Sequence, residues 1–172
     1  KLSLAPSTHH LTSLGSDAGF RRYFTIGGFP QYLAVDAPPA YENTLQFIAI
    51  CEHLRAQQVR CPHILFVDID QGFLIIENFG TQLFSTMLTD ANRDQLYKTA
   101  IDCLLTIQHS PDNPDLIPRY DAALLRTELT LFSEWFVADL LSYTLTPSET
   151  RLLETTFTRI IEEVAALPQV FV

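Results

Sequence analysis

The first eighty residues contain short runs in which apolar and polar positions alternate, a pattern typical of half-buried strands. Residues 20–26 carry alternating aromatics, Gly27-Gly28 gives a turn, and residues 31–35 follow. Two short β-rich runs joined by glycines predict a hairpin. Pro38-Pro39 ends the second strand, because proline has no backbone N–H to donate to the ladder.

The apolar period then changes from two to about 3.6 over residues 42–57, which predicts a helix. Its apolar positions recur at intervals of three and four: Leu45, Ile48, Ala49 and Leu54. Residues 64–67 and 73–76 predict two more strands, and Gly72 between them permits a tight turn. The order β-β-α-β-β predicts an antiparallel sheet with one helix packed on it.

After Gly80 the pattern becomes helical. Residues 93–108 carry one apolar face, and Asp121 can cap a helix that runs to about Tyr143. The run 146–149, Thr-Pro-Ser-Glu, is a helix start signal for a further helix to about residue 167. Residues 169–172 predict the opening of a strand. Because a lone strand has nothing to pair with, we expect the chain to continue past Val172.

Composition narrows the function classes. The chain has 172 residues, is 47% hydrophobic and carries a formal net charge of −9. That charge argues against a nucleic-acid or anionic-membrane partner, since phosphate groups would repel it. No apolar run reaches the roughly 18 residues that a membrane span needs. Cys51, Cys61 and Cys103 are widely spaced without a C-x-x-C pair, which favours reduced cysteines and a cytoplasmic location over a disulfide framework or a zinc site.

Three stretches carry a resemblance to a known family: SDAGFRRYF at 16–24, FLIIENFG at 73–80 and PQVFV at 168–172. With the element order, they resemble the aminoglycoside phosphotransferase family, which has a protein-kinase-like fold. The runs FRRYF, DAPP, QGFLI and residues 120–135 are similar to a bacterial branch that phosphorylates the anomeric hydroxyl of N-acetylmuramate and N-acetylglucosamine. The resemblance implies an α+β fold. An antiparallel N-lobe with one packed helix would span residues 1–80, and a partial, mainly helical C-lobe would span residues 81–172.

The resemblance places SDAGFRRYF over the phosphates of a nucleotide. Small residues let backbone N–H groups approach phosphate closely, and arginine adds a bidentate fork. The stretch alone favours a surface hairpin with solvated arginines, whereas its position in the lobe favours the phosphate loop. Alternation places the two arginines on opposite faces, so only one is expected to face nucleotide. The candidates are Ser16, Asp17, Ala18, Gly19, Arg21 and Arg22.

The stretch FLIIENFG would be the strand and hinge that read adenine. By resemblance, the Glu77 carbonyl would accept a hydrogen bond from the adenine amino group, and the Phe79 N–H would donate to a ring nitrogen. Ile76 would lie behind the ring. The residues alone fit a plain core strand that ends in a turn equally well.

Two positions depart from the kinase pattern. A kinase-like lobe normally pairs a lysine on its third strand with a glutamate on its helix. Alignment puts Asp36 at the lysine and, approximately, Phe47 at the glutamate. Our hypothesis is that Arg21 or Arg22, held by Asp36, replaces the missing cation. The alternative is that Asp36 is a turn residue before Pro38.

Phosphoryl transfer needs a carboxylate near the acceptor hydroxyl and ligands for Mg²⁺. The resemblance places both beyond Val172, so no catalytic or metal-binding residue is assigned within the chain. The leading hypothesis is a kinase that uses ATP and Mg²⁺ to phosphorylate a small-molecule hydroxyl, such as that of an amino sugar. The alternatives are a non-catalytic nucleotide- or protein-binding module and an aminoglycoside phosphotransferase.

The aromatics Phe132, Trp135 and Phe136 favour core packing over a wall of the acceptor cleft near Glu134 or Asp139.

Overall fold

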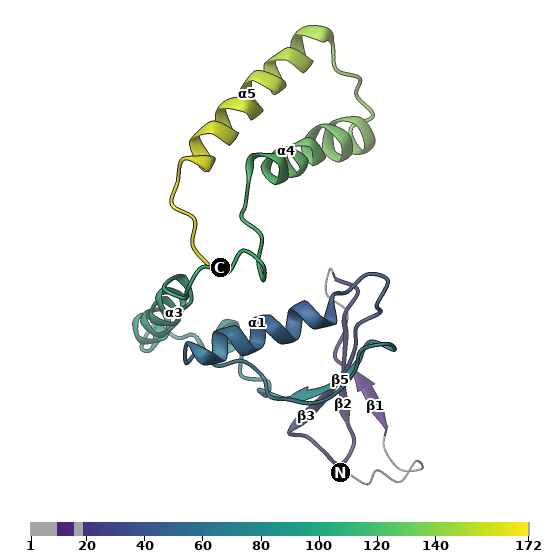
Figure 1. Ribbon diagram of the computed structural model, residues 1–172, viewed down its shortest axis with the longest axis vertical. Helices are drawn as coiled ribbons and strands as arrows, with labels where there is room; N and C mark the ends of the chain where they lie inside the picture. The colour runs from purple at the N-terminus through teal and green to yellow at the C-terminus, as the bar shows by residue number, and fades with distance from the viewer. Residues whose placement is uncertain (1–9, 16–18, 172) are drawn as a thin grey trace. The chain divides into compact units, whose positions relative to one another are not determined.

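The computed structural model describes residues 10–15 and 19–171. The chain forms two compact units that divide between Ser110 and Pro111 (Figure 1). The first unit contains the β-sheet and the helices up to residue 108, and the second contains only helices and their connections.

The sheet has five strands in the order β1-β2-β3-β5-β4, and every neighbouring pair is antiparallel. The strands are β1 Leu11–Ser13, β2 Arg22–Ile26, β3 Tyr32–Asp36, β4 Ile64–Asp68 and β5 Phe73–Glu77. The predicted hairpin and the two later strands are confirmed. The sequence did not predict β1, because its three residues are all exposed and too few to show alternation.

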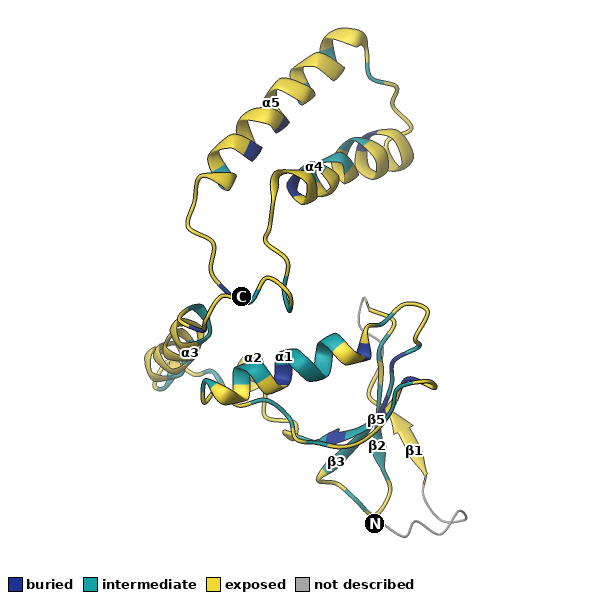
Figure 2. Cartoon of the chain, viewed as in Figure 1, coloured by how far each residue is buried: buried dark blue, intermediate teal, exposed yellow. Residues whose placement is uncertain are grey.

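The helix predicted after the hairpin is α1, Thr44–Ala56. Asn43 caps it, since its side-chain oxygen accepts a hydrogen bond from the backbone N–H of Gln46 at 3.0 Å. Phe47 of α1 packs on a core that includes Val35 and Leu74. Figure 2 shows this core as the dark blue segments of the sheet. One sheet face is therefore closed by α1, as the β-β-α-β-β order predicted.

Gly72 joins β4 to β5 with a φ of +73°, the left-handed conformation that glycine adopts at little cost. Its carbonyl accepts a hydrogen bond from the Ala37 N–H at 2.8 Å. A Cβ atom at this position would lie 2.1 Å from the Ala37 carbonyl oxygen. The turn therefore packs directly against the end of β3, and no side chain fits between them.

After Gly80 the first unit contains α2, Phe84–Met87, and α3, Arg93–Gln108. The second unit contains α4, Ala122–Leu131, the π-helix η1, Phe132–Leu140, and α5, Pro147–Ala165. The predicted bounds of α3 and the predicted start of α5 are confirmed. The Thr146–Glu149 capping box forms at α5, and hydrogen bonds from Thr146 lower the pKa of the Glu149 carboxyl.

Two sequence predictions in the second unit are wrong. The helix expected to run to Tyr143 changes at Phe132 into the π-helix η1. In a π-helix each backbone N–H bonds to the carbonyl five residues earlier, as the Leu141 N–H does to the Phe136 carbonyl. Residues 169–171 are not in a strand within the described part of the chain. Instead, the Gln169 side-chain amide bonds to both backbone groups of Tyr120, at 3.2 and 3.0 Å.

Substituting Gly72 tests the contact between the turn and β3. Gly72→Ala is expected to reduce the free energy of unfolding by at least about 3 kcal/mol, because strain and a backbone clash add. Gly28→Ala is the matched control, since Gly28 has a φ of +83° and nothing within 4 Å of an added Cβ. It should lose only about 1 kcal/mol. Urea unfolding monitored by circular dichroism measures both, and equal losses would contradict the packing argument.

Candidate nucleotide site

One face of the sheet carries an apolar row with an ion pair at its end. The register places Arg22 opposite Asp36 and Phe24 opposite Ala34, and Ala34 is opposite Ile75 on β5. Because side chains alternate along a strand, these five share one face, away from the core under α1. Phe24, Ala34 and Ile75 are half-buried. The sequence analysis missed this row, because only the strand register reveals it.

The guanidinium of Arg22 forms an ion pair with Asp36, where Nη2 donates to Oδ2. The Arg22 side chain remains 58% exposed, whereas that of Asp36 is 19% exposed. The sequence analysis expects Asp36 at the position of the kinase lysine. The structure thus brings together the arginine and the carboxylate that the hypothesis paired, and it leaves most of the guanidinium accessible.

Arg21 makes a different set of contacts. Its Nη2 donates to Glu42 Oε2 at 2.7 Å, and its Cζ lies 4.6 Å from the centroid of the Phe47 ring. The Arg21 side chain is only 21% exposed. The sequence analysis expects Phe47 near the position of the kinase glutamate. The connection between sheet and helix is therefore made here by an arginine that packs on an aromatic ring and bonds to a carboxylate before the helix.

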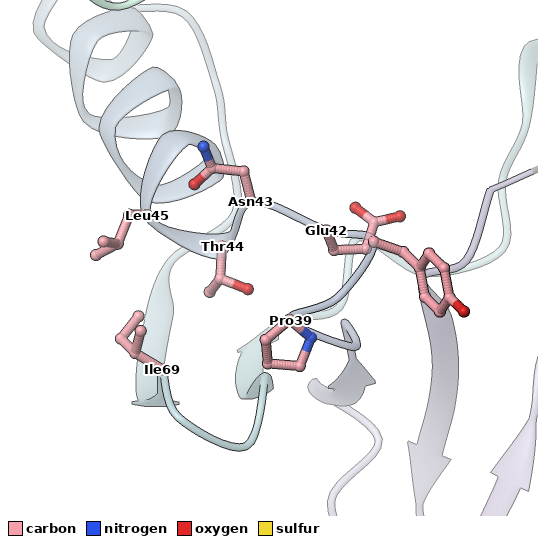
Figure 3. A pocket seen from close by; sticks show the side chains of 7 residues that line it. Pro39, Glu42, Asn43, Thr44, Leu45 and Ile69 are labelled. Atoms are coloured by element: carbon pink, nitrogen blue, oxygen red, sulfur yellow. The ribbon is translucent and has the colours of Figure 1, made fainter.

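The segment before β2 is tied to the connection between β3 and α1. The rings of Phe20 and Tyr41 stack with centroids 4.3 Å apart, next to the Arg21–Glu42 pair. Glu42 and Tyr41 also line an open cleft of about 440 Å³ at the start of α1 (Figure 3). Of the predicted phosphate-loop residues, Ser16, Asp17 and Ala18 lie outside the described residues, and Gly19 is exposed.

The hinge after β5 is anchored by Asn78. Its backbone N–H donates to the Gln31 carbonyl at 2.8 Å, and its Nδ2 donates to the Pro30 carbonyl at 2.8 Å. Its Oδ1 accepts from the Gly80 N–H at 2.9 Å. Within residues 10–15 and 19–171, the backbone N–H of Phe79 donates to no protein group. The anchored hinge therefore keeps one donor available for a ligand, at the residue that the sequence analysis selected.

Ile76 and Glu77, the two residues before Asn78, make contacts outside the apolar row. Ile76 is 5% exposed and belongs to the core under α1. The Glu77 N–H donates to the His63 carbonyl at 2.8 Å. The Glu77 carboxylate contacts Arg60 at 2.5 Å and accepts from the His63 N–H at 3.2 Å. The contacts of Glu77 with His63 and Arg60 were not predicted, because the partners lie in a loop without a recognisable pattern.

The sequence analysis also considered cysteines, metal ligands and an aromatic cluster. Burial raises the pKa of the Cys51 and Cys61 thiols, and each thiol also influences the pKa of the other; their spacing in the sequence did not predict this proximity. In the described ranges no three His, Cys, Asp or Glu side chains gather as a metal site. No described helix is long and apolar enough to cross a membrane. Trp135 is 64% exposed and Phe132 and Phe136 are also exposed, so the expected core packing is not present.

The antiparallel sheet with α1 on one face, the anchored hinge and the Arg22–Asp36 pair have the arrangement of the N-lobe of a kinase-like fold. Residues 10–172 match the phosphotransferase enzyme family known as APH, and the chain belongs to this family. This confirms the family and the fold class inferred from the sequence.

The chain is similar to N-acetylmuramate/N-acetylglucosamine kinases. It is 39% identical over 163 residues to the kinase of Pseudomonas putida. The matched region covers 94% of this chain and 48% of the relative. It is 30% identical to that of Neisseria meningitidis serogroup B, covering 94% of this chain and 49% of the relative. The chain thus spans about half the length of these relatives.

A solved structure, the ternary complex of streptomycin, ATP and APH(2")-IIa, has the same fold. Its TM-score is 0.60 at 12% identity, over 94% of this chain and 57% of that one. At this identity the likeness supports the architecture and says nothing about the substrate.

Arg21 and Arg22 can be compared directly to test whether Arg21 stabilises the fold while Arg22 does not. Arg21→Ala is expected to lower the free energy of unfolding by about 2 kcal/mol, because a part-buried charge-assisted hydrogen bond and a cation–π contact are both lost. Arg22→Ala should cost less than about 1 kcal/mol, as an exposed ion pair does. Both variants remove one positive charge, so urea unfolding compares them directly. Equal losses would contradict the assignment of Arg21 as the structural brace.

Proposed function

We propose that this chain is the nucleotide-binding part of a kinase that transfers the γ-phosphoryl group of ATP to the hydroxyl of an amino sugar. The observation that carries the proposal is the arrangement of one sheet face. An accessible arginine is held by Asp36 at one end, an apolar row lies in the middle, and the hinge with its available Phe79 N–H follows the other end. The names of the relatives support N-acetylmuramate or N-acetylglucosamine as the acceptor.

The arrangement has the order of groups that a nucleoside triphosphate requires. Asp36 pairs with Phe73 and Tyr32 pairs with Glu77, so four residue steps along β3, about 13 Å, separate the charged end from the hinge. The base would lie against Phe24, Ala34 and Ile75, since ligand sites combine apolar walls with few polar groups. The triphosphate would extend toward Arg22, whose guanidinium can bind two phosphate oxygens.

The reaction itself requires groups that we place outside this chain. The sugar hydroxyl oxygen attacks the γ-phosphorus, the bond to the oxygen that bridges the β- and γ-phosphorus breaks, and ADP leaves. The hydroxyl proton passes to a carboxylate base. Mg²⁺ would neutralise the charge that develops on the phosphate oxygens. In this proposal residues 1–80 hold the nucleotide and residues 81–172 begin the lobe that binds the acceptor, and the base and metal ligands follow Val172.

One observation favours a second candidate, a non-catalytic nucleotide- or protein-binding module. By the sequence alignment, Asp36 and Phe47 replace the lysine–glutamate pair of kinases. Arg22, at the start of β2, bonds to Asp36, and Arg21, the residue before it, packs on the Phe47 ring. A protein that had lost phosphoryl transfer could retain such a lobe for binding alone. Activity measurements separate the two candidates.

The longest natural form of the protein is expected to phosphorylate N-acetylmuramate or N-acetylglucosamine. Phosphorus NMR should show an anomeric phosphate, and coupled ADP detection gives the rate. The methyl glycosides, whose anomeric oxygen is blocked, are the matched control and should be inert. ATP binding without transfer to any sugar or aminoglycoside would support the binding module. Transfer by residues 1–172 alone would refute the location of the base beyond Val172.

Arg22 is expected to act on the phosphates alone. Arg22→Ala should weaken the binding of ATP and of inorganic tripolyphosphate by about tenfold or more, because a charge-assisted bidentate contact is lost. Adenosine, which has no phosphate, should bind as before. Calorimetric titration of the three ligands measures this, and Arg21→Ala provides the neighbouring control. If both variants bind ATP like the parent protein, neither arginine replaces the lysine.

A further inference from the structure

We infer that Arg60 is a positioning residue for adenine recognition, acting through the Glu77 side chain to keep the Glu77 backbone carbonyl free. The inference rests on the proposed function, because it concerns how the same hinge reads the base. It is carried by one irregularity in the hydrogen bonds between the loop before β4 and the end of β5.

The irregularity concerns His63 and Glu77, which face each other one position beyond the paired residues Ile64 and Ile76. Residues that form a hydrogen-bonded antiparallel pair exchange two bonds, each N–H donating to the other's carbonyl. Here the Glu77 N–H donates to the His63 carbonyl at 2.8 Å. The second bond of the pair does not reach the backbone carbonyl of Glu77. Instead, the His63 N–H donates to the side-chain oxygen Glu77 Oε2 at 3.2 Å. In the part of the chain that the structure describes, the Glu77 carbonyl receives no bond from His63.

The side-chain carboxylate therefore takes the place of the backbone carbonyl as acceptor. This substitution satisfies the His63 N–H, which would otherwise compete for the Glu77 carbonyl. The carbonyl is then available to the exocyclic amino group of adenine, the partner that the proposed function gives it. The Glu77 carboxylate must be held in one place for this to work, since a free side chain would turn toward water.

Arg60 supplies that restraint. Its Nη2 bonds to Glu77 Oε1 at 2.5 Å, so the two carboxylate oxygens serve two different donors. The Cζ of Arg60 also lies 4.9 Å from the centroid of the Phe79 ring. One guanidinium thus contacts the side chains of both hinge residues whose backbone groups would read adenine. Arg60, His63 and Glu77 line a cleft of about 240 Å³, and Arg55 bonds to His63 Nδ1 at 2.8 Å.

The exposure of Arg60 separates positioning from general stability. Its side chain is 74% exposed, and that of Glu77 is 24% exposed. An ion pair with one partner so exposed contributes little to the free energy of unfolding. Removing Arg60 should therefore leave the fold intact and release the Glu77 carboxylate. The His63 N–H would then turn to the Glu77 carbonyl and compete with the ligand.

The test compares ATP with purine riboside triphosphate, which lacks the exocyclic amino group and otherwise has the same base and phosphates. The longest natural form of the protein should prefer ATP by about fivefold, as one neutral hydrogen bond allows. In Arg60→Ala and in Glu77→Leu the preference should fall to about twofold or less, with the affinity for the analogue unchanged. Arg60→Lys, which keeps the charge, should retain part of the preference.

Two controls accompany these variants. Arg159→Ala breaks an exposed arginine–glutamate pair in the second unit, with Glu163 at 3.0 Å, and should change neither affinity. Arg22→Ala should weaken both nucleotides equally and preserve the preference. The double variant of Arg60→Ala with Glu77→Leu should lose no more preference than either single variant, since both act on one carbonyl.

The outcomes distinguish this inference from the function on which it rests. If the parent protein binds neither nucleotide, the proposed function fails, and the inference fails with it. If the parent prefers ATP and Arg60→Ala and Arg60→Lys keep the full preference, the inference alone is wrong. An equal loss of ATP, analogue and tripolyphosphate binding in Arg60→Ala, together with a lower melting temperature, would show a structural role and also overturn it.

Discussion

The pairing of β3 with β2 and β5 is the constraint on which the rest of the first unit depends. It sets Arg22 beside Asp36, Ala34 between Phe24 and Ile75, and Tyr32 beside Glu77. Because the side-chain period is two, a shift of β3 by one residue would move Asp36, Ala34 and Tyr32 to the face under α1. The contact of Gly72 with Ala37 and the anchoring of Asn78 on Pro30 and Gln31 fix the two ends of the same register.

A second constraint is the need to pair partly buried carboxylates. Asp36, Glu42 and Glu77 have side chains that are 19%, 17% and 24% exposed, and each is bonded to an arginine. In a chain with a net charge of −9, these pairs place scarce cations at both ends of the sheet. Leaving any of these carboxylates unpaired would carry a desolvation cost. The arginines differ in how much of each guanidinium remains accessible, and this difference separates a brace such as Arg21 from an accessible cation such as Arg22.

The sequence predicted those parts of the fold that local chemistry determines. The period-two runs of the hairpin, the bounds of α3 and the capping box of α5 each depend on neighbouring residues. The Arg22–Asp36 pair could be proposed because residue 36 is not a lysine, so a cation for the phosphates has to come from another residue of the lobe. The contacts of Arg60 could not, since Glu77 lies 17 residues away and the contact depends on the loop path before β4. The change from α4 to η1 could not be predicted from the sequence either, because a π-helix differs from an α-helix in the size of its hydrogen-bonded ring and not in residue type.

In the proposed function, the two arginines of the FRRYF run divide between them a task that kinase-like lobes usually give to one lysine. That lysine joins sheet to helix and also binds phosphate, so its two roles compete for the same charge. Here Arg21 joins the sheet to the start of α1 through Glu42 and Phe47, on the face away from Asp36. Arg22 needs only Asp36 to orient it and keeps its remaining donors exposed. Because neighbouring residues of an extended chain point to opposite faces, this division follows directly from placing the two arginines side by side.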